Sequence, residues 1–524
     1  MNLAELAERS AERLGEHVTL DFEGERFTNW ELLRRARRLQ TALESLGLGP
    51  GRVAALFMVN HPIIYPIFQG IFRSGAAAVP IMFQLTVPEL RYILEDTEAA
   101  LVLTDAQLLP KVREAVERLP TVRHVVVRGG ESLPERQPPE LSLQSLLEAD
   151  ERPSLPDIHD DALALMLYTS GTTGKPKGVM LAHANLIASA EAANHAAELD
   201  RWEGPRIAMS AMPMAHIFGV GVMNSGYLIP DRLAGAYSVQ MRWFEPEGFM
   251  ALIQRQGCTT MAAVPTMLAM ILNHPNVEAY DLSSLKEVVC GAAPLPVELA
   301  RAFMDRYACR VREIYGMTEN TGIGSANRLS EPYRPGSAGR PYFNTEVRIV
   351  DDAGRTVPAG ARGEIVTRGP TTMKGYHKKP EATTEAVRDG WLHTGDIGYF
   401  DAEGYLYIVD RKKDMIIRGG ENIYPAEVED ALYAHPAVAE AAVVGVPDPI
   451  YGEAVVAFVV PRRQPKVEEA ELIEFVRGRI TKFKAPERVF FLEALPKAGV
   501  GKILRRELRE MARRAMAPAS SGGR

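Results

Sequence analysis

The sequence predicts an α/β protein made of doubly wound βα units, followed by a β-rich unit and a smaller α+β unit. Up to about residue 332, short continuous apolar runs alternate with helix-like stretches, which is how buried parallel strands appear in a sequence. From about residue 333, short strands separated by Gly and Asp turns replace this pattern. After Asp410, helices and strands alternate again on a smaller scale.

The first βα series opens with a helix. Thr28 and Glu31 have the spacing of a capping box, and Leu32, Ala36, Leu39 and Leu43 follow at helical spacing. Strands are expected at residues 53–58, 76–81, 99–104 and 124–128. A polar, Pro-rich stretch at 131–157 indicates a connection, so the first subdomain is expected to span about 1–157.

The second βα series is expected to span about 158–332. Its strands are predicted at residues 163–168, 206–211, 234–239, 258–264 and 285–290. A β-rich subdomain at about 333–410 follows, and its strands are predicted within residues 345–355, 363–369 and 404–410, with no helical pattern between them.

The last unit is expected to span 411–524. Its strands are predicted at residues 438–446, 453–460 and 488–495. The basic stretch 410–414 is the predicted linker, with a hinge near Lys413. The tail, 517–524, has the composition of a disordered end.

Composition narrows the class of protein. The 524 residues are 46% hydrophobic and 24% charged, which is typical of soluble globular chains. The 60 basic and 67 acidic residues give a net charge of −7, which argues against nucleic-acid and membrane-surface binding. Cys258, Cys290 and Cys309 are too far apart for a disulfide scaffold or zinc ribbon and suit a reducing compartment. With no signal-peptide pattern and no membrane-spanning run, we expect a cytoplasmic protein.

The strongest chemical signal is YTSGTTGKPKG, residues 168–178. An apolar strand runs into a loop of glycines, hydroxyl residues and lysines, whose N–H groups, hydroxyls and charges suit a phosphate. A Walker A loop is excluded because Pro176 directly follows Lys175 and would disturb the helix that such a loop opens. The candidate phosphate-binding residues are Thr169, Ser170, Gly171, Thr172, Thr173, Gly174, Lys175 and Lys177.

This loop resembles the signature of the adenylate-forming (ANL) superfamily. Four further matches follow in the same order: YGMTE (315–319), GWLHTGD (390–396), DRKKDMIIRGGENIYPAEVE (410–429) and PKAGVGK (496–502). The resemblance favours the acyl-CoA synthetase branch. It implies a large N-terminal domain of two doubly wound sheets plus a small β-barrel, residues 1–410, and a small mobile C-terminal domain. The implied activity is ATP-dependent, AMP-forming acid:CoA ligation with ATP, Mg²⁺ and coenzyme A.

The resemblance also assigns roles in nucleotide binding. Glu319 offers a hard oxygen to a magnesium ion on the ATP phosphates, and Thr318 donates to the α-phosphate. Asp396, expected after a glycine turn, accepts the ribose hydroxyls, and Arg411 reaches the ribose. The other implied nucleotide-binding residues are Gly291, Ala292 and Ala293 as an adenine platform, with Tyr315, Gly316 and Met317 of YGMTE.

The remaining roles concern the two half-reactions. Lys502 resembles the lysine that bridges the substrate carboxylate and the α-phosphate, where a positioned ammonium offsets the repulsion between two anions. Gly419, Gly420 and Glu421 resemble the loop that lines the coenzyme A tunnel. His216 resembles the residue at the entrance of the acyl pocket, although a lone histidine on an apolar segment is also typical of a core.

Residues 212–230 resemble the region that shapes the acyl site, and they contain no acid, Lys or Arg. An unpaired buried charge on the substrate would be costly, which favours an apolar monocarboxylate, either a medium- or long-chain fatty acid or an aromatic acid. Three alternatives stay open: an adenylating enzyme that loads an acyl carrier protein, a non-catalytic nucleotide sensor and a luciferase-like oxygenase. The expected partners are small molecules, and a homodimer is an option.

Overall fold

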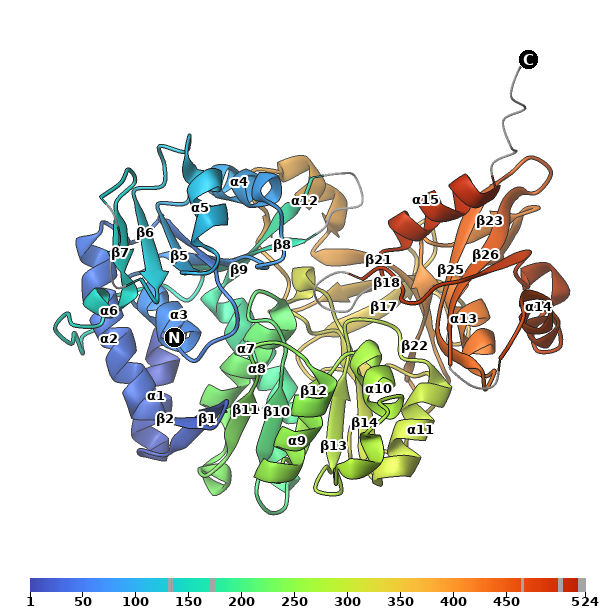
Figure 1. The fold of residues 1–524 in the computed structure, drawn as a ribbon, viewed down its shortest axis with the longest axis horizontal. Helices are drawn as coiled ribbons and strands as arrows, with labels where there is room; N and C mark the ends of the chain where they lie inside the picture. The colour runs from blue at the N-terminus through green and yellow to red at the C-terminus, as the bar shows by residue number, and fades with distance from the viewer. Residues whose placement is uncertain (131–132, 134, 170–174, 463–465, 498–502, 517–524) are drawn as a thin grey trace.

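The computed structural model describes residues 1–130, 133, 135–169, 175–462, 466–497 and 503–516. The described strands form four sheets (Figure 1). Two large sheets with helices on their faces make up most of the molecule, a five-stranded sheet adjoins them, and the C-terminal sheet lies at one end. No helix in the described ranges is long and apolar enough to cross a membrane.

The first sheet has eight strands and is doubly wound, as predicted. Its order is β19 (Gly375–Tyr376), β9 (Lys177–Ala182), β8 (Leu163–Thr169), β4 (Ala77–Pro80), β3 (Val53–Phe57), β5 (Leu101–Asp105), β6 (His124–Arg128) and β7 (Glu140–Ser142). Six strands, β8 to β7, run parallel; β9 is antiparallel to β8, and β19 is antiparallel to β9.

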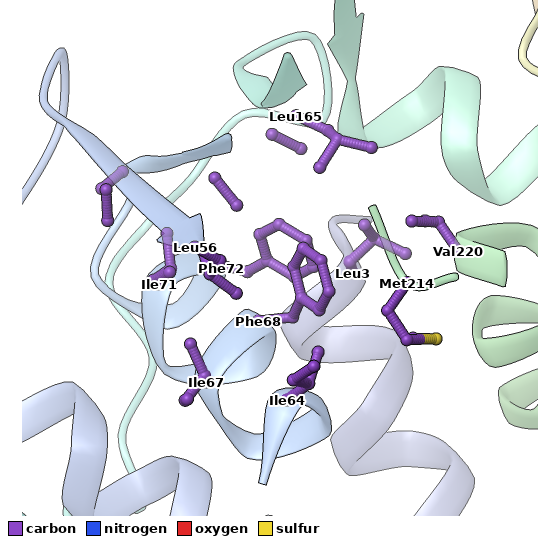
Figure 2. Packing of buried hydrophobic residues seen from close by; sticks show 14 of the residues in the cluster. Leu3, Leu56, Ile64, Ile67, Phe68, Ile71, Phe72, Leu165, Met214 and Val220 are labelled. Carbon is purple, nitrogen blue, oxygen red and sulfur yellow. The ribbon is translucent and has the colours of Figure 1, made fainter. Parts of the chain in front are cut away.

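Both faces of this sheet are buried, because successive strand side chains point to opposite sides. In β3, Ala54 and Leu56 pack with the helices of one face, and Ala55 and Phe57 with those of the other. The first face carries α1 (Leu3–Leu14), α2 (Asn29–Ser45) and α3 (Ile64–Arg73), and the second carries α4 (Val87–Asp96) and α5 (Leu109–Val116). Figure 2 shows α3 residues Phe68 and Phe72 in the core of the first face.

Helix α2 starts where predicted, and one of the two hydrogen bonds of the predicted capping box forms. Thr28 Oγ1 accepts a hydrogen bond from the backbone N–H of Glu31 at 3.1 Å. The Glu31 carboxylate pairs with Arg35 at 2.6 Å instead of returning to the cap backbone. A good cation four residues on competes for the carboxylate.

The expected connection at 131–157 is not only a linker, because it includes β7 and the short helix α6 (Leu143–Leu146). The expected boundary near residue 157 does not separate the sheets either. Strands β8 and β9 join the first sheet, while β1 (Val18–Phe22) and β2 (Glu25–Thr28) join the second. An apolar run marks a buried strand but does not specify its neighbour.

The second sheet has nine strands and is parallel from β14 to β1. Its order is β16 (Arg340–Pro341), β15 (Ser325–Ala326), β14 (Arg310–Tyr315), β13 (Glu287–Cys290), β12 (Thr260–Ala263), β10 (Ile207–Ser210), β11 (Tyr237–Gln240), β1 and β2. One face packs on α9 (Pro246–Gln256), α10 (Pro265–Leu272) and α11 (Val297–Tyr307).

Helix α8 (Ile217–Ser225) lies between the two large sheets. Val220 and Met223 belong to the core of the first sheet, while Phe218 and Val222 pack against the core of the second. Helix α7 (His183–Ala196) packs beside it. Short 3₁₀ turns complete this part: η1 (Leu199–Arg201), η2 (Gly226–Leu228), η3 (Asp231–Leu233), η4 (Val277–Ala279) and η5 (Thr318–Asn320).

The third sheet is antiparallel and corresponds to the predicted β-rich unit. It contains β17 (Glu346–Val350), β18 (Gly363–Arg368), β21 (Trp391–Phe400), β20 (Val387–Arg388) and β22 (Leu406–Arg411). Its described strands pair in an open order, so the expected small barrel is an open sheet here. A helix that the sequence pattern did not indicate, α12 (Pro380–Ala386), precedes β20 and begins with Pro380 as its first residue.

The fourth sheet forms the α+β unit at the C-terminal end. It contains β24 (Glu421–Ile423), β23 (Ile416–Arg418), β26 (Gly452–Pro461), β25 (Val438–Asp448) and β27 (Arg488–Phe491). One face packs on α13 (Pro425–Tyr433) and α14 (Glu469–Arg477), and the other on α15 (Arg505–Met516). The turn η6 (Lys482–Lys484) precedes β27.

Candidate active site

Several predicted site residues follow the carboxyl ends of parallel strands in the two large sheets. Strand β8 ends at Thr169, β13 at Cys290 and β14 at Tyr315, and the predicted motifs follow these ends. Ligands of open α/β sheets bind at such carboxyl ends. The expected phosphate-binding residues 170–174 and Lys502 lie outside the described residues.

Asp396 lies at the centre of a buried polar cluster. It is 4% exposed; its Oδ2 accepts a 2.8 Å hydrogen bond from the Tyr315 hydroxyl, and its Oδ1 lies 3.1 Å from Nε of Arg411. The negative charge of Asp396 raises the pKa of Arg411. An ionised carboxylate offers about four acceptor positions. Tyr315 and Arg411 occupy two of them, so two positions remain for hydroxyl groups.

The position of Asp396 corrects the expectation of a glycine turn. Gly395 has a φ of +70°, but both residues are part of the ten-residue strand β21, where Asp396 faces Arg411 across the ladder with β22. Cross-strand pairing therefore brings Asp396 and Arg411 together, whereas Tyr315 arrives from the second sheet.

Glu319 connects the second sheet to the phosphate-loop region. The hydroxyl of Tyr376 on β19 donates to Glu319 Oε1 at 2.9 Å, and Met373 N–H donates to the Glu319 carbonyl at 2.9 Å. The Lys177 ammonium lies 5.0 Å from the centre of the Tyr376 ring, a cation–π contact. Together these contacts bring a carboxylate and a lysine to one edge of the first sheet.

The surroundings of Glu319 fit magnesium held mainly by phosphates. Among the described residues no group of three or more His, Cys, Asp or Glu side chains forms a metal site. Glu319 is 7% exposed, and among the described residues its Oε1 accepts a hydrogen bond from one neutral hydroxyl, that of Tyr376. Magnesium commonly binds through one or two carboxylates plus substrate phosphates, so a single glutamate is a sufficient protein ligand.

Two glycines allow close backbone packing at the nucleotide side. A Cβ on Gly291 would lie 2.6 Å from Ile314 Cγ1, and one on Gly316 would lie 2.2 Å from the carbonyl carbon of Gly322. The next residue, Ala292, is exposed and adopts a left-handed φ of +71°. Ala293 is half-buried beside it. The residues predicted as a platform therefore form an open, strained βα loop, as functional sites often do.

Thr318 and Glu319 lie in the turn η5, directly after β14. Thr318 is 8% exposed. Asn320 Oδ1 accepts a 2.8 Å hydrogen bond from Met317 N–H, which shapes this turn. The predicted YGMTE residues thus occupy one compact turn at a strand end.

A cavity of about 320 Å³ opens beside the predicted nucleotide residues and includes Ala292 in its wall. This volume lies at the lower end of the range for ligand pockets. Its aromatic lining comes from Phe68, Phe83, Phe218, Trp243 and Phe244. Its polar lining comes from Asn60, Gln84, His216, Arg242, Thr266 and Lys497.

The cavity wall continues into the main core. Leu56, Ile64, Phe68 and Met214 belong both to the cavity lining and to the core cluster in Figure 2. Only the beginning of the predicted acyl-site stretch lines the cavity, because its later residues lie in α8 and face the cores. The cavity also contains Arg242, so the absence of cations within 212–230 does not describe the whole cavity.

His216 lines this cavity and also caps the N-terminus of α8. Its Nδ1 accepts a 3.3 Å hydrogen bond from Phe218 N–H at the start of α8. The structural and functional interpretations of this histidine are therefore compatible.

The C-terminal unit contributes Lys497 to the cavity, with its ammonium held 2.9 Å from Glu440 Oε1. Gly419, Gly420 and Glu421 are exposed and are not among the described cavity residues. They form the turn and first strand residue of a hairpin, β23–β24, rather than an irregular loop. This arrangement thus presents the segment before Lys502, and not the 419–421 turn, to the cavity.

Family models match almost the whole chain. Residues 7–377 match that of AMP-binding enzymes, and residues 427–502 match that of the AMP-binding enzyme C-terminal domain. The chain belongs to the family of AMP-binding enzymes.

Two curated relatives of this family cover nearly the full chain. A feruloyl-CoA synthase of Amycolatopsis sp is 40% identical over 501 residues, which is 95% of this chain and 96% of the relative. A long-chain-fatty-acid–CoA ligase of Bacillus subtilis is 35% identical over 528 residues, covering 96% and 93%.

A solved relative agrees in fold. The crystal structure of the anthranilate CoA ligase AuaEII with anthranoyl-AMP matches with a TM-score of 0.90 and 29% identity, covering 99% of this chain and 98% of that one. The present chain is therefore an AMP-forming acyl-CoA synthetase, and it uses ATP, coenzyme A and a carboxylic acid.

Sequence reasoning missed three residues of this synthetase. Tyr376, Arg242 and Lys497 each lie far along the chain from the residues they meet. The available signal was only indirect: Arg242 lies three residues after the predicted strand 234–239, and Lys497 belongs to the motif PKAGVGK.

Proposed function

We propose that the acid is an apolar monocarboxylate, a medium- or long-chain fatty acid or an aromatic acid of comparable length. The observation that supports this is the predominantly apolar cavity beside Ala292. Each methylene buried there contributes about 0.8 kcal/mol. A charged group buried without a partner would cost more than several methylenes gain.

The proposed reaction has two steps. The carboxylate attacks the α-phosphate of ATP, pyrophosphate leaves, and an acyl-adenylate forms. The thiol of coenzyme A then attacks the acyl carbonyl and AMP leaves. The mixed anhydride replaces a poor leaving group, oxide, by a good one.

The described residues support separate roles in the first step. Asp396, held by Tyr315 and Arg411, is positioned to accept the ribose hydroxyls. We assign the phosphates to the 169–177 segment, and a positively charged Lys177 beside Tyr376 supports this assignment. Lys502 is proposed to steady the attacking carboxylate and the α-phosphate.

Magnesium is proposed as the cofactor. Glu319 would hold it together with the ATP phosphates, and Tyr376 orients the Glu319 carboxylate. When bound, the ion neutralises phosphate charge that would otherwise repel the attacking carboxylate. A substitution of Glu319 by Gln should therefore raise the magnesium concentration needed for half-maximal rate.

The acceptor and the setting are proposed as follows. Coenzyme A is proposed as the acceptor, and the exposed glycine pair 419–420 leaves space for a pantetheine arm to approach closely. A carrier protein has the same arm, so the comparison with and without coenzyme A decides between the two. The Asp396 and Glu319 carboxylates are both held by tyrosine hydroxyls, and such positioned carboxylates argue against a nucleotide sensor without catalysis. A cytoplasmic location remains a prediction, and it suits the three buried free cysteines. A homodimer also remains a prediction.

The deciding experiment is pyrophosphate release over a panel of acids, with and without coenzyme A. The panel holds fatty acids of graded length, cinnamic acids, malonate and free amino acids. We expect apolar acids to give the highest kcat/KM and thioester to form only with coenzyme A. A preference for malonate or an amino acid would contradict the cavity assignment, and product only on a phosphopantetheine carrier would favour the carrier-loading alternative.

A further inference from the structure

The cavity has two chemically different ends, and strand order places them. Ala292 follows β13, Val264 follows β12, Ala211 follows β10 and Arg242 lies two residues after the end of β11; all four line the cavity. These strands are consecutive neighbours in the second sheet. With about 4.8 Å between strands, the strand leading to Arg242 lies roughly 14 Å from the strand leading to Ala292.

Arg242 is the charged group at this far end. Its Nη2 lies 3.0 Å from Glu23 Oε2, and its guanidinium carbon lies 5.7 Å from the centre of a Trp243 ring. Its Nε is buried and has no hydrogen-bond acceptor among the described residues. The side chain is 33% exposed and lines the cavity, so it is not sealed in the core.

Neighbouring polar groups are already engaged. Asn60 donates to the carbonyls of Met212 and Met241 and accepts from Met214 N–H. Nδ1 of His61 accepts from a backbone N–H two residues on, and burial, with nearby arginines, lowers the pKa of His61 to about 4, so it is neutral at pH 7. Arg242 is therefore the charged hydrogen-bond donor for a ligand that reaches this end.

We propose that Arg242 recognises an oxygen atom at the far end of the acid, so that the enzyme prefers apolar acids bearing a distal neutral acceptor, such as a hydroxyl, methoxy or keto oxygen. This inference rests on the proposed function. Glu23 already balances the charge of Arg242, which favours a neutral oxygen, because a second carboxylate would approach Glu23 as well. The guanidinium N–H groups that are not bonded to Glu23 then donate to the substrate oxygen.

The test compares matched acids that differ in one oxygen: 4-hydroxycinnamate with cinnamate, and 10-hydroxydecanoate with decanoate. The measured quantity is the kcat/KM ratio of each pair by pyrophosphate release. We expect the hydroxylated acid to be favoured about tenfold in at least one pair, the scale of one charge-assisted hydrogen bond. Arg242→Met should lower the rate of the hydroxylated acid about tenfold more than that of its partner, and Arg242→Lys should restore part of the ratio.

Two further variants make the outcome unambiguous. Arg301→Met removes an exposed arginine on α11 whose partner is Glu298, and it should leave the ratio unchanged. Glu23→Gln removes the competing carboxylate and should raise the ratio, which tests the inference even if Arg242→Met does not fold.

The result distinguishes the two proposals. Turnover of the plain acids with equal ratios in wild type, Arg242→Met and Glu23→Gln would overturn the role of Arg242 and leave the proposed function standing. Absence of pyrophosphate release with every apolar acid would instead refute the proposed function itself.

Discussion

At the residue scale, the polar groups of the site owe their position to buried partners. Asp396 is nearly inaccessible, yet the Tyr315 hydroxyl and Arg411 hold both its oxygens in place. Burial, and the neighbouring carboxylate, raise the pKa of Tyr315 well above its usual value, so the phenol remains a donor. A carboxylate fixed in this way loses little entropy when it binds hydroxyl groups.

Replacing Asp396 by Asn should weaken ATP binding. The shape is kept, but each lost charge-assisted hydrogen bond costs about 1.5–3 kcal/mol, so we expect the KM for ATP to rise at least about tenfold with the acid KM little changed. Steady-state kinetics of adenylation measure both. Asp401→Asn is the matched control, since this carboxylate lies in a turn, accepts backbone N–H groups from Glu403 and Tyr405 and lies 3.8 Å from Arg334 Nη1, away from the Asp396 cluster. An unchanged KM for ATP in a folded Asp396→Asn enzyme would contradict the ribose assignment.

At the element scale, the turn η5 shows how backbone packing places two functional side chains. The chain reverses after β14: Gly322 N–H donates to the Met317 carbonyl at 2.8 Å and Gly324 N–H to the Tyr315 carbonyl at 2.9 Å. This reversal brings Gly316 against Gly322 with no space for a side chain. The positions of Thr318 and Glu319 therefore depend on a glycine at 316.

Gly316→Ala should damage adenylation without unfolding the protein. The new Cβ meets backbone at 2.2 Å, so the turn must shift, and a displacement of about 1 Å can cost about 10²-fold in rate. We expect this loss in pyrophosphate release, with a circular dichroism spectrum like that of wild type.

The matched control for Gly316→Ala is Gly221→Ala on α8. A Cβ at Gly221 meets nothing within 4 Å, and alanine in a helix interior is favoured by about 0.5–1 kcal/mol over glycine. This control should be as active as wild type and slightly more stable to heat. Equal activity of both variants would show that the η5 turn tolerates displacement.

At the scale of the whole molecule, the C-terminal unit docks through its first helix. Helix α13 packs against α11 and β22, and Asp410 Oδ2 accepts a 3.0 Å hydrogen bond from Ala426 N–H at the start of α13. Lys497 from the same unit lines the cavity, whereas the 419–421 turn does not. In this placement of the C-terminal unit, the segment that leads to Lys502 lies at the cavity, and the predicted coenzyme A turn, 419–421, does not.

Two substitutions should separate the half-reactions if the C-terminal unit rotates between them. Lys502→Ala removes a positioned cation, and such losses typically cost about 10²–10³-fold. We expect that cost in adenylation, with thioester formation from supplied acyl-AMP close to wild type. Lys413→Pro stiffens the predicted hinge and should slow thioester formation instead. Equal damage to both half-reactions in each variant would contradict a rotating unit, while the ligase activity would stand.

The docked arrangement should also depend on pH. Burial raises the pKa of Asp410 to about 6 and that of Glu313 to about 8, and the nearby Asp430 carboxylate adds to the effect on Glu313. Docking therefore binds protons. Proton binding stabilises docking fully below the ordinary carboxyl pKa values near 4. This stabilisation is lost as the pH rises through about 6 to 8, so docking weakens at alkaline pH.

Energy transfer between dyes on the large and C-terminal units measures this docking. We expect high transfer at pH 6 and lower transfer at pH 9. The double variant Glu313→Gln, Asp410→Asn removes both titrating groups and should flatten the pH profile. A profile that is flat in wild type, or unchanged in the double variant, would show that these carboxyls do not govern docking.

The sequence by itself determined the local part of this protein. Apolar runs predicted the central strands of both large sheets, such as β3, β5 and β12, but not strands β1, β2 and β9. Burial on two faces leaves such an apolar run whatever the neighbour. The motifs YTSGTTGKPKG, YGMTE and HTGD identified the family, because phosphate, magnesium and ribose each require particular residue types within a few positions. These are interactions between residues close along the chain, and a sequence displays them directly.

Only the tertiary structure decided which segments meet. It assigned β8 to the first sheet and β1 to the second, placed Asp396 within a strand opposite Arg411, and brought Tyr376 to Glu319 and Arg242 to the cavity. The physical reason is that strand periodicity specifies which face of a strand is buried but not which strand lies beside it. Pairing depends on packing across the whole sheet, and the functional side chains at the strand ends follow from that pairing.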